Sequence, residues 1–516
     1  MSEFSEEAEI LKKILAPEKI EETHISYAFL TKDRVYKLKK KVDFGFLDYT
    51  QKKGRKKFCM LEKSLNERFA KGIYERVLKI VRYDKKFSLV PMENTLVPID
   101  YVVEMKRIPD KNFLHNRISS DEISEEFLSN LGVSIASILK SIKPKVSFAE
   151  EYGSYEVIKK NWVENFEQTE PYIGKYINEK YYKYIKHEIF KFMETNKDLF
   201  KKRVNNGYVI DGHGDLRLEH VYFDNEKVGL IDCIEFNNRF RCNDVVADFV
   251  FLCMELDQKG YYDYSDGLLA GFLSVFDDIS SRRLVNFYKC YRAFVRAKVT
   301  CFLLDQKDEK WPGFGDKYEE LVRLVDLSLA YAYNMVDIKT VVFYGLMGAG
   351  KSKNAQEFCS RFASYYLNSD MVRKKELGIP MTKKVYIKFG KGIYSDDISL
   401  NIYNRLGEQA SAKNDLCRMV VVDGSFSRIK FLEKFVDERV FAIRRIKCSA
   451  PDDVLIKRLE EREKGKETSV SDGRVEIFYQ HKESFEDIGY NIMLDTADEL
   501  KKHPDQIISY LIENET

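Results

Sequence analysis

The chain has 516 residues, of which 44% are hydrophobic and 33% are charged, and its formal net charge is +2. This length exceeds what one hydrophobic core supports, so we expect two or three domains. The near-neutral charge gives no general attraction to nucleic acid or anionic membranes. No apolar run reaches the roughly 18 residues of a membrane span. The acidic, amphipathic N-terminus is unlike a signal peptide, and nine cysteines without a C-x-x-C pair favour free thiols. We therefore expect a cytoplasmic globular protein.

The first hundred residues predict a small, mostly antiparallel lobe. Residues 1–22 favour a short helix, and two strands at 24–31 and 34–42 are joined by a tight turn. A charged helix follows at 50–70, then strands near 78–84, 87–91 and 100–106. Lys37 and Lys39 share one strand face, where either could reach ATP phosphates. Glu62, on the next helix, could pair with that lysine.

A second part, residues 107–336, is predicted to be largely helical around a loop-rich centre at 208–245. The centre contains His213-Gly-Asp215 and, further on, a strand-like run ending at Asp232. Phosphoryl transfer from ATP needs a carboxylate to orient the attacking hydroxyl and further ligands for Mg²⁺. The spacing makes Asp215 the candidate catalytic base, with His220 and Asp232 as candidate metal ligands. Asp244 and Asp248 are interpreted as structural residues that hydrogen-bond this loop.

Four segments of this half resemble the aminoglycoside phosphotransferase family, which has a protein-kinase-like fold. They are VYKLKKKVDFGFLDYT, GHGDLRLEHVYF, IDCIEFNNRFRCNDVVADFVFL and YKCYRAFVRAKV. The resemblance covers residues 24–335. It implies that Lys37, rather than Lys39, binds ATP phosphates and pairs with Glu62. Two positions depart from the family pattern: Arg217 stands where a second histidine is usual, and His220 where asparagine is commoner.

The third part begins with a phosphate loop, Gly345-Leu-Met-Gly348-Ala349-Gly350-Lys351-Ser352, which directly follows the strand-like run 340–344. In a G-x-x-x-x-G-K-[ST] loop the backbone N–H groups surround phosphate oxygens, and the following helix adds its positive end. Lys351 is predicted to reach the β- and γ-phosphates, and the Ser352 hydroxyl to bind Mg²⁺. Strand–loop–helix alternation from 339 onward predicts a parallel α/β domain.

Three further features accompany the loop. Asp370 follows an apolar strand and is predicted to face the transferred phosphoryl group as a catalytic residue, with Arg373 on the substrate side. An apolar strand ending at Asp423 is typical of a Walker B carboxylate that binds the metal. The charged segment 461–474 resembles the lid of nucleoside- and gluconate-kinase-like enzymes. That resemblance implies that lid arginines, Arg458, Arg462 and Arg474, clamp the nucleotide.

The sequence as a whole predicts an α+β protein-kinase-like, two-lobed domain at 1–336 (small lobe about 1–106, helical lobe about 107–336). An α/β P-loop domain with a parallel sheet follows at 337–516. The predicted function is a bifunctional ATP-dependent kinase that phosphorylates hydroxyl groups of small molecules at two sites, with ATP and Mg²⁺ as cofactors. One alternative is a single active kinase whose P-loop domain senses nucleotide. The other is polynucleotide-end phosphorylation, which the near-neutral charge disfavours. Asp370 distinguishes a catalytic P-loop domain from a nucleotide sensor, because a pure sensor needs no acceptor-side carboxylate.

Overall fold

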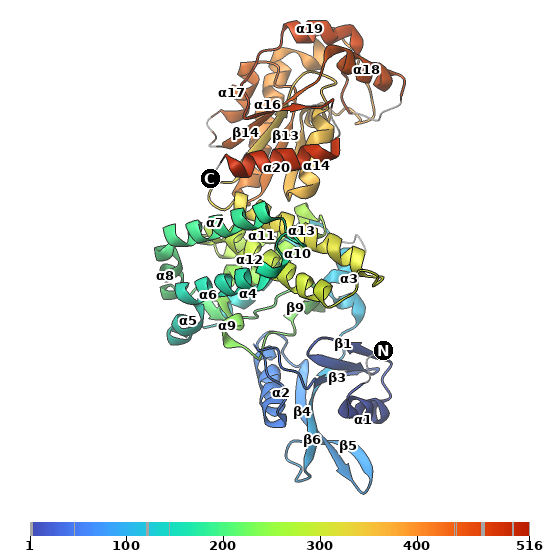
Figure 1. Ribbon diagram of the computed structural model, residues 1–516, viewed down its shortest axis with the longest axis vertical. Helices are drawn as coiled ribbons and strands as arrows, with labels where there is room; N and C mark the ends of the chain where they lie inside the picture. The colour runs from blue at the N-terminus through green and yellow to red at the C-terminus, as the bar shows by residue number, and fades with distance from the viewer. Residues whose placement is uncertain are drawn as a thin grey trace. The chain divides into compact units, whose positions relative to one another are not determined.

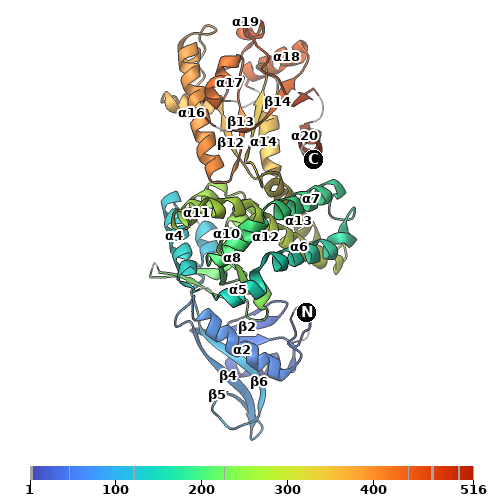
Figure 2. The same ribbon diagram turned by 90° about the vertical axis from the view of Figure 1, so that its left-hand side faces the viewer.

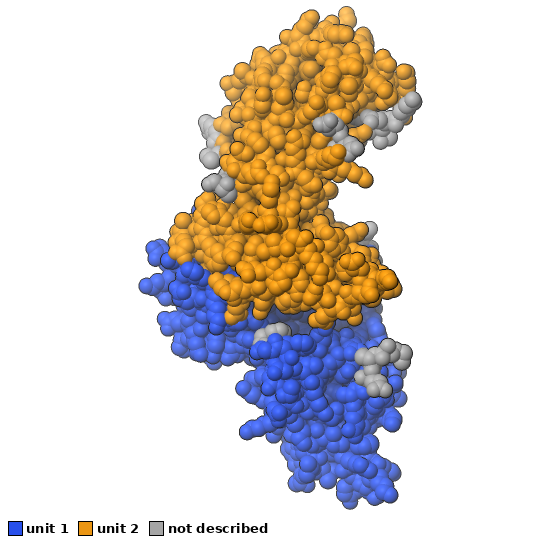
Figure 3. Space-filling model, viewed as in Figure 1, with its two compact units in different colours: residues 1–162, 196–255, 267–280 blue, residues 163–195, 256–266, 281–516 orange. Residues whose placement is uncertain are grey.

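The computed structural model describes residues 4–45, 47–119, 123–143, 145–225, 227–437, 439, 441–465, 470–497 and 500–514. The chain divides into two compact units (Figure 3). Unit 1 comprises Met1–Trp162, Asn196–Glu255 and Gly267–Ser280, and unit 2 comprises Val163–Thr195, Leu256–Asp266 and Ser281–Thr516. Unit 2 thus includes helical segments that precede residue 336, and the boundary at 336/337 stays a prediction. Within the described ranges, no helix is both long and apolar enough to cross a membrane.

Unit 1 begins with a six-stranded antiparallel sheet (Figure 1). Its strands, in the spatial order β1-β2-β3-β6-β4-β5, are β1 (Lys19–Glu22), β2 (Ser26–Leu30), β3 (Arg34–Lys39), β6 (Pro98–Lys106), β4 (Tyr74–Tyr83) and β5 (Lys86–Pro91). Helix α1 (Glu6–Leu15) packs on one face, with Leu11 against Phe29 and Leu38. Helix α2 (Lys52–Asn66) packs on the other, with Cys59 among Val103 and its neighbours. This confirms the predicted antiparallel sheet.

Helix α2 places Glu62 against this sheet. The helix is rich in lysine, yet its buried residues Arg55, Cys59, Glu62 and Asn66 recur at the spacing of one helical face. Leu38 points to the opposite face of the sheet, among the residues packed on α1. Because side chains alternate along a strand, Lys37 and Lys39 both point toward α2.

The rest of unit 1 is mostly helical. It contains α3 (Leu114–Ser119), α4 (Glu125–Ser141), α5 (Val146–Gly153), α8 (Lys197–Asn205), α9 (Asn238–Arg241), most of α10 (Val245–Gln258) and of α11 (Tyr262–Val275), and the first half of α6 (Tyr155–Thr169). Strand β7 (Val209–Asp211) pairs antiparallel with β10 (Cys242–Asp244), and β8 (Val221–Asp224) pairs with β9 (Lys227–Leu230). The predicted catalytic loop connects β7 to β8. An antiparallel sheet and a helical part are therefore present, and a protein-kinase-like arrangement of two lobes stays a prediction.

Unit 2 is built around a five-stranded parallel sheet (Figure 2). Its order is β12 (Ser364–Asn368), β13 (Met419–Asp423), β11 (Lys339–Tyr344), β14 (Ala442–Ser449) and β15 (Ile492–Asp495). The helices of this sheet are α14 (Lys351–Arg361), α15 (Ser369–Glu376), α16 (Asp396–Asp415), α17 (Ile429–Val436), α18 (Asp452–Glu463), α19 (Phe478–Glu483) and α20 (His503–Glu513). Earlier segments add α7 (Glu179–Thr195), α12 (Ile279–Asp305) and α13 (Phe314–Tyr333). The parallel α/β prediction is confirmed.

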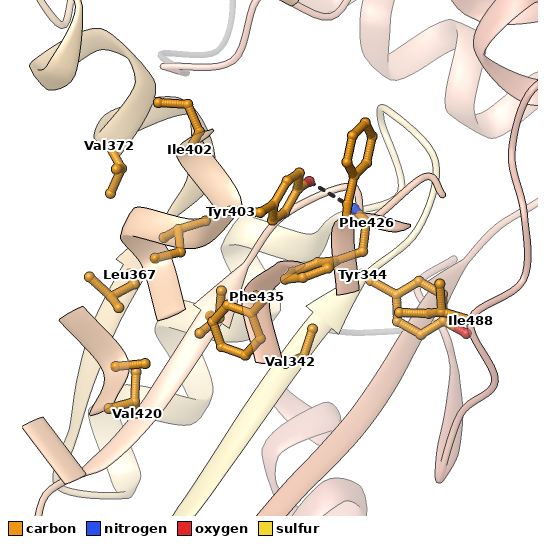
Figure 4. Packing of buried hydrophobic residues seen from close by; sticks show 14 residues of the cluster. Val342, Tyr344, Leu367, Val372, Ile402, Tyr403, Val420, Phe426, Phe435 and Ile488 are labelled. Atoms are coloured by element: carbon orange, nitrogen blue, oxygen red, sulfur yellow. Dashed lines mark hydrogen bonds between the residues drawn. The ribbon is translucent and has the colours of Figure 1, made fainter. Parts of the chain in front are cut away.

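Helices pack on both faces of the parallel sheet, so its strands are buried on both sides. On one face Val342 and Tyr344 pack with Tyr403 of α16 and Phe435 of α17 (Figure 4). On the other face Phe343 contacts the Phe358 ring of α14, with the ring centroids 5.9 Å apart. Strands covered on both faces read as continuous apolar runs. Because the strands are parallel, the ends of β11, β12 and β13 meet at one edge of the sheet, where ligands of open α/β sheets bind.

Candidate active sites

The phosphate loop adopts a backbone that requires glycine at its ends. Gly345, directly after β11, has a φ of +143°, and a Cβ there would lie 2.3 Å from the Cys448 carbonyl oxygen on β14. Gly350, with a φ of +76°, precedes the first residue of α14. The loop therefore passes close to the neighbouring strand and delivers its N–H groups to the start of a helix, which is the geometry of an anion site.

Lys351 lines the cavity that opens at this loop. Its Nζ donates a hydrogen bond to the Leu346 carbonyl oxygen at 2.9 Å. No carboxylate of the described residues forms an ion pair with it within 4.0 Å. Burial lowers the pKa of Lys351, and the more distant charge of Asp423 opposes this shift only in part. A cation in this state gains most from a bound anion.

Asp423 ends β13 at the same cavity and is almost completely buried. One carboxylate oxygen accepts hydrogen bonds from the Tyr366 hydroxyl at 2.9 Å and the Asn368 amide at 2.6 Å. Ser352 lines the cavity as well. A carboxylate and a hydroxyl are hard oxygen ligands that suit Mg²⁺. Ser352 and Asp423, which are predicted to hold a magnesium ion with ATP, thus line one cavity and carry the oxygen ligands that Mg²⁺ prefers.

Asp370 and Arg373 line the same cavity from α15. The Asn368 side chain caps this helix by accepting from the Asp370 N–H at 3.0 Å and the Met371 N–H at 2.9 Å, which fixes Asp370 in the first turn. Burial raises the pKa of the Asp370 carboxyl. Arg373 pulls it down, and the like charge of Asp472 raises it further. A carboxylate with a raised pKa is better suited to accept a proton from a hydroxyl.

Asp472 and His481 line this cavity and are absent from the sequence-based prediction, whereas the sequence offers Tyr394 either as a substrate contact or as part of a structural loop. The Tyr394 hydroxyl donates to Asp472 at 2.9 Å and lies 3.4 Å from an Asp370 oxygen, so it bridges the two carboxylates. His481 is buried and lines the same cavity, and its Nδ1 has no hydrogen-bond partner among the described residues. Burial lowers the pKa of His481 to about 4. No local motif marks these positions, although Tyr394 follows the glycine turn at 390–392, which is a weak signal.

The lid arginines take different positions. Arg462 and Arg474 line the cavity. Arg458 does not: it donates to the Gly348 carbonyl at 3.3 Å and to the Thr496 carbonyl at 2.6 Å, so it braces the phosphate loop from outside the cavity. Nucleotide contact by these arginines stays a prediction. Part of the predicted lid, residues 466–469, lies outside the described residues.

In unit 1, Glu62 pairs with two lysines. Its oxygens lie 3.0 Å from Lys37 Nζ and 2.7 Å from Lys39 Nζ. The prediction that Lys37 pairs with it instead of Lys39 is therefore wrong, because both side chains point to the same face and one buried carboxylate reaches both. Lys37 also contacts Asp232, and Lys39 contacts Glu235. Burial alone would lower the pKa of each lysine, but these carboxylates outweigh it and hold both well above the usual value.

Asp232 lies near His220, the other predicted metal ligand, and His220 in turn contacts the predicted base, Asp215. Its φ is +64°, a conformation that a residue other than glycine rarely adopts. One Asp232 oxygen lies 4.0 Å from His220 Nε2, and His220 Nδ1 lies 2.6 Å from the Asp215 carbonyl oxygen. These residues come together as predicted. Among the described residues, however, no group of three or more His, Cys, Asp or Glu side chains is arranged to hold a metal. Metal binding by His220 and Asp232 stays a prediction.

One aspartate, Asp248, accepts hydrogen bonds from the backbone of the loop that carries Asp215. The Asp248 carboxylate, which is fully buried, accepts from the His213 N–H at 2.6 Å and the Gly214 N–H at 2.9 Å. This confirms its predicted structural role. Asp244 differs, because it forms a buried ion pair with Arg203 at 2.7 Å instead of contacting the loop. The Asp215 side chain itself is 38% exposed, as a residue that meets substrate should be.

Comparison with known proteins gives a family match within the P-loop part and relatives that align with most of the chain. Residues 341–487 match the model of a family described as AAA domain. Over 464 residues the chain is 25% identical to uncharacterized proteins of Mycobacterium tuberculosis (strain ATCC 25618 / H37Rv) and Mycobacterium bovis (strain ATCC BAA-935 / AF2122/97). These alignments cover 89% of this chain and 88% of each relative. They therefore extend well beyond the P-loop segment.

Solved structures with some likeness to the chain include a sugar kinase from Janibacter sp. HTCC2649 (15% identity, TM-score 0.28) and a gluconokinase from Sinorhizobium meliloti 1021 (18%, 0.25). Each covers 34% of this chain, and 94% of the solved chain is covered. A shikimate kinase from Aquifex aeolicus (15%, 0.25) matches 34% of this chain and 98% of its own. Similarity at this level does not define an activity. The phosphate loop, the parallel sheet and the family match together define residues 341–487 as a P-loop domain.

Proposed function

We propose that the P-loop half is an ATP-dependent kinase that transfers the γ-phosphoryl group to a hydroxyl group of a small molecule. The observation that carries this proposal is that Lys351 and Asp370 line one cavity. A nucleotide needs the lysine, whereas only an acceptor needs the aspartate. The chemistry asks for little beyond positioning and charge stabilisation.

In this mechanism the N–H groups of the phosphate loop and Lys351 bind the nucleotide phosphates. Asp370 orients the acceptor hydroxyl and accepts its proton as the oxygen attacks the γ-phosphorus. Tyr394, between Asp370 and Asp472, fixes the carboxylate that does this. Ser352 and Asp423 would hold Mg²⁺, which neutralises phosphate charge when bound.

The test is ADP release by the full chain with ATP, Mg²⁺ and a panel of sugars, sugar acids, nucleosides and a 5′-hydroxyl oligonucleotide. We expect one class of small hydroxyl compound to stimulate release, and Lys351→Ala to abolish that stimulation. Stimulation by the oligonucleotide alone would favour polynucleotide-end phosphorylation. Nucleotide binding with no stimulation by any member would favour the sensor alternative.

A second phosphotransfer site in unit 1 is also proposed, because its candidate residues are assembled in one place. Lys37, Glu62 and Asp232 form a connected ion-pair group, and Asp215 lies on the adjacent loop beside His220. Such a group could position ATP, with Asp215 as the base for a hydroxyl acceptor. If Asp215→Asn leaves all ADP release unchanged in the Lys351→Ala background, this second site is not a kinase.

A further inference from the structure

Arg373 is a buried cation that forms no ion pair within 4.0 Å among the described residues. It is 4% exposed. Its Nη1 donates to the Ile393 carbonyl at 2.7 Å and lies 3.4 Å from the Ser399 hydroxyl. Its Nε is buried and has no hydrogen-bond partner, and within the described residues no carboxylate oxygen lies within 4.0 Å of the guanidinium. Nη2 forms no hydrogen bond with the described residues either, so the edge formed by Nε and Nη2 has no ligand among them.

Apart from Lys351, three cations that line or border the cavity have acidic partners. Arg428 pairs with Asp396 at 2.6 Å, and Arg474 pairs with Glu476 at 2.9 Å. Lys374, which is fully buried, pairs with Asp472 at 3.4 Å. Asp370, whose pKa Arg373 lowers, lies beyond ion-pair distance. A buried cation without a direct ion-pair partner is costly unless another group supplies one. The nucleotide phosphates would supply the negative partner of Lys351. The mechanism supplies none for Arg373.

The position of Arg373 suggests what supplies its counter-charge. It lies three residues after Asp370 on α15, so the two side chains share one helix face, and both line the cavity. The guanidinium carbon is 4.7 Å from the centre of the Tyr394 ring, and the hydroxyl of that ring reaches toward Asp370. Hydroxyl-bearing side chains also line the cavity, among them Ser399, Tyr403, Ser425 and Ser427. The surroundings are polar and suit a hydroxylated ligand.

We propose that the acceptor of the P-loop site is a small hydroxylated anion whose carboxylate or phosphate group binds the Nε–Nη2 edge of Arg373. This rests on the proposed function of the site. Two parallel N–H···O bonds from a guanidinium match either acid group. With the acid held there, a hydroxyl on the same molecule meets Asp370. Its oxygen forms the new bond to the γ-phosphorus, the bond from that phosphorus to the β–γ bridging oxygen breaks, ADP leaves, and the hydroxyl proton passes to Asp370.

The first experiment measures anion binding without turnover. The Lys351→Ala chain removes the nucleotide-phosphate lysine, and its thermal unfolding is followed against sodium acetate and against inorganic phosphate, with sodium chloride at equal ionic strength as the reference. A ligand that binds only the folded state raises the unfolding temperature with concentration. We expect at least one of the two anions to do so, and Arg373→Gln to remove the effect.

The identity of the effective anion distinguishes the two sources, a carboxylate or a phosphomonoester. Arg373→Lys, which keeps the charge but loses the paired geometry, should retain a weaker effect. Lys375→Gln, on the exposed side of the same helix, is the matched control and should retain all of it. If neither anion stabilises the chain with Arg373 more than the Arg373→Gln chain, the proposal is overturned.

The second experiment uses the acceptor found by ADP release. Arg373→Gln should raise the acceptor KM at least tenfold and leave the ATP KM within twofold. A neutral acceptor used equally well by both chains would overturn the proposal. Anion binding that depends on Arg373, combined with no turnover of any hydroxyl compound, would instead overturn the kinase function and leave the anion site standing.

Discussion

Lys37 in unit 1 and Lys351 in unit 2 are both predicted to bind phosphates, yet their surroundings are opposite. Lys37 contacts two carboxylates, which hold its pKa well above the usual value. Lys351 has no carboxylate within ion-pair distance among the described residues, and burial lowers its pKa. The first site already balances its charges internally, whereas the second leaves a positive charge for a ligand to neutralise. The difference teaches that an unpaired cation, rather than a lysine in a motif, indicates where an anion binds.

The largest effect should come from Asp370→Asn. The amide cannot accept the hydroxyl proton, so turnover at the P-loop site should fall by about 10²–10⁴-fold. ATP affinity, measured by calorimetry, should stay within twofold because Asp370 does not contact the nucleotide in the mechanism. Asp397→Asn is the control: this exposed aspartate of α16 does not line the cavity, so the variant should keep full turnover. Full activity of Asp370→Asn would show that Asp370 does not accept the proton of the acceptor hydroxyl.

A pair of matched variants tests the charge comparison through stability. Lys39→Met leaves Glu62 and Glu235 buried with one counter-charge fewer, and losing one partner of a buried pair costs about 3–5 kcal/mol of unfolding free energy. Lys351→Met removes a cation that has no such partner, so without nucleotide the unfolding free energy should stay the same or rise. Chemical denaturation of both variants gives the comparison. A loss of similar size in the two would contradict it.

Two aspartates of the unit 1 loop should separate positioning from chemistry. Asp248→Ala removes the acceptor for two buried N–H groups and should destabilise unit 1 by about 1–3 kcal/mol. Asp215→Asn, at a half-exposed site, should leave denaturation unchanged and remove any turnover of that site. If Asp215→Asn unfolds the chain as readily as Asp248→Ala, Asp215 is structural.

In one respect the two units should behave alike, because each buries a neutral histidine. Burial lowers the pKa of His213 to about 3 and of His481 to about 4. Both values lie below the 6.5 of an exposed histidine, so at intermediate pH the unfolded chain binds more protons and stability falls as pH falls from about 6.5 toward 4. His481→Phe should reduce this loss by about 1 kcal/mol between pH 7.5 and 5.5. A pH dependence equal to that of the unchanged chain would show that folding does not lower the pKa of His481.

The sequence was most informative where function is local in the chain. Gly345, Lys351 and Ser352 belong to one motif. Asp423 ends β13, and Asp370 lies in the first turn of the helix that follows β12, so parallel topology alone places them at one edge. The antiparallel sheet followed from alternating strand-like segments, and the parallel sheet followed from the strand–loop–helix pattern after residue 339. The period of a strand could not choose between Lys37 and Lys39, because positions two apart share a face.

Other parts of the sites depend on folding that no local pattern encodes. Tyr394 and Asp472 are 78 residues apart in sequence and meet through a hydrogen bond. Glu235 was missed because its partner Lys39 lies 196 residues earlier. Asp244 was assigned to the wrong contact because the buried Arg203 that takes it lies on α8, outside the motif. In each case the missing information is which distant segment packs against the motif.

The most direct test of the account is ATP·Mg²⁺ binding by the full chain with one lysine removed at a time. Calorimetric titrations would compare the unchanged chain with Lys351→Ala and with Lys37→Ala. We expect Lys351→Ala to eliminate the binding event of the P-loop site and Lys37→Ala to preserve the affinity of that site within twofold. Undiminished binding by Lys351→Ala, or its loss in Lys37→Ala with the fold intact, would contradict the claim that the unpaired lysine of unit 2 is where the nucleotide binds.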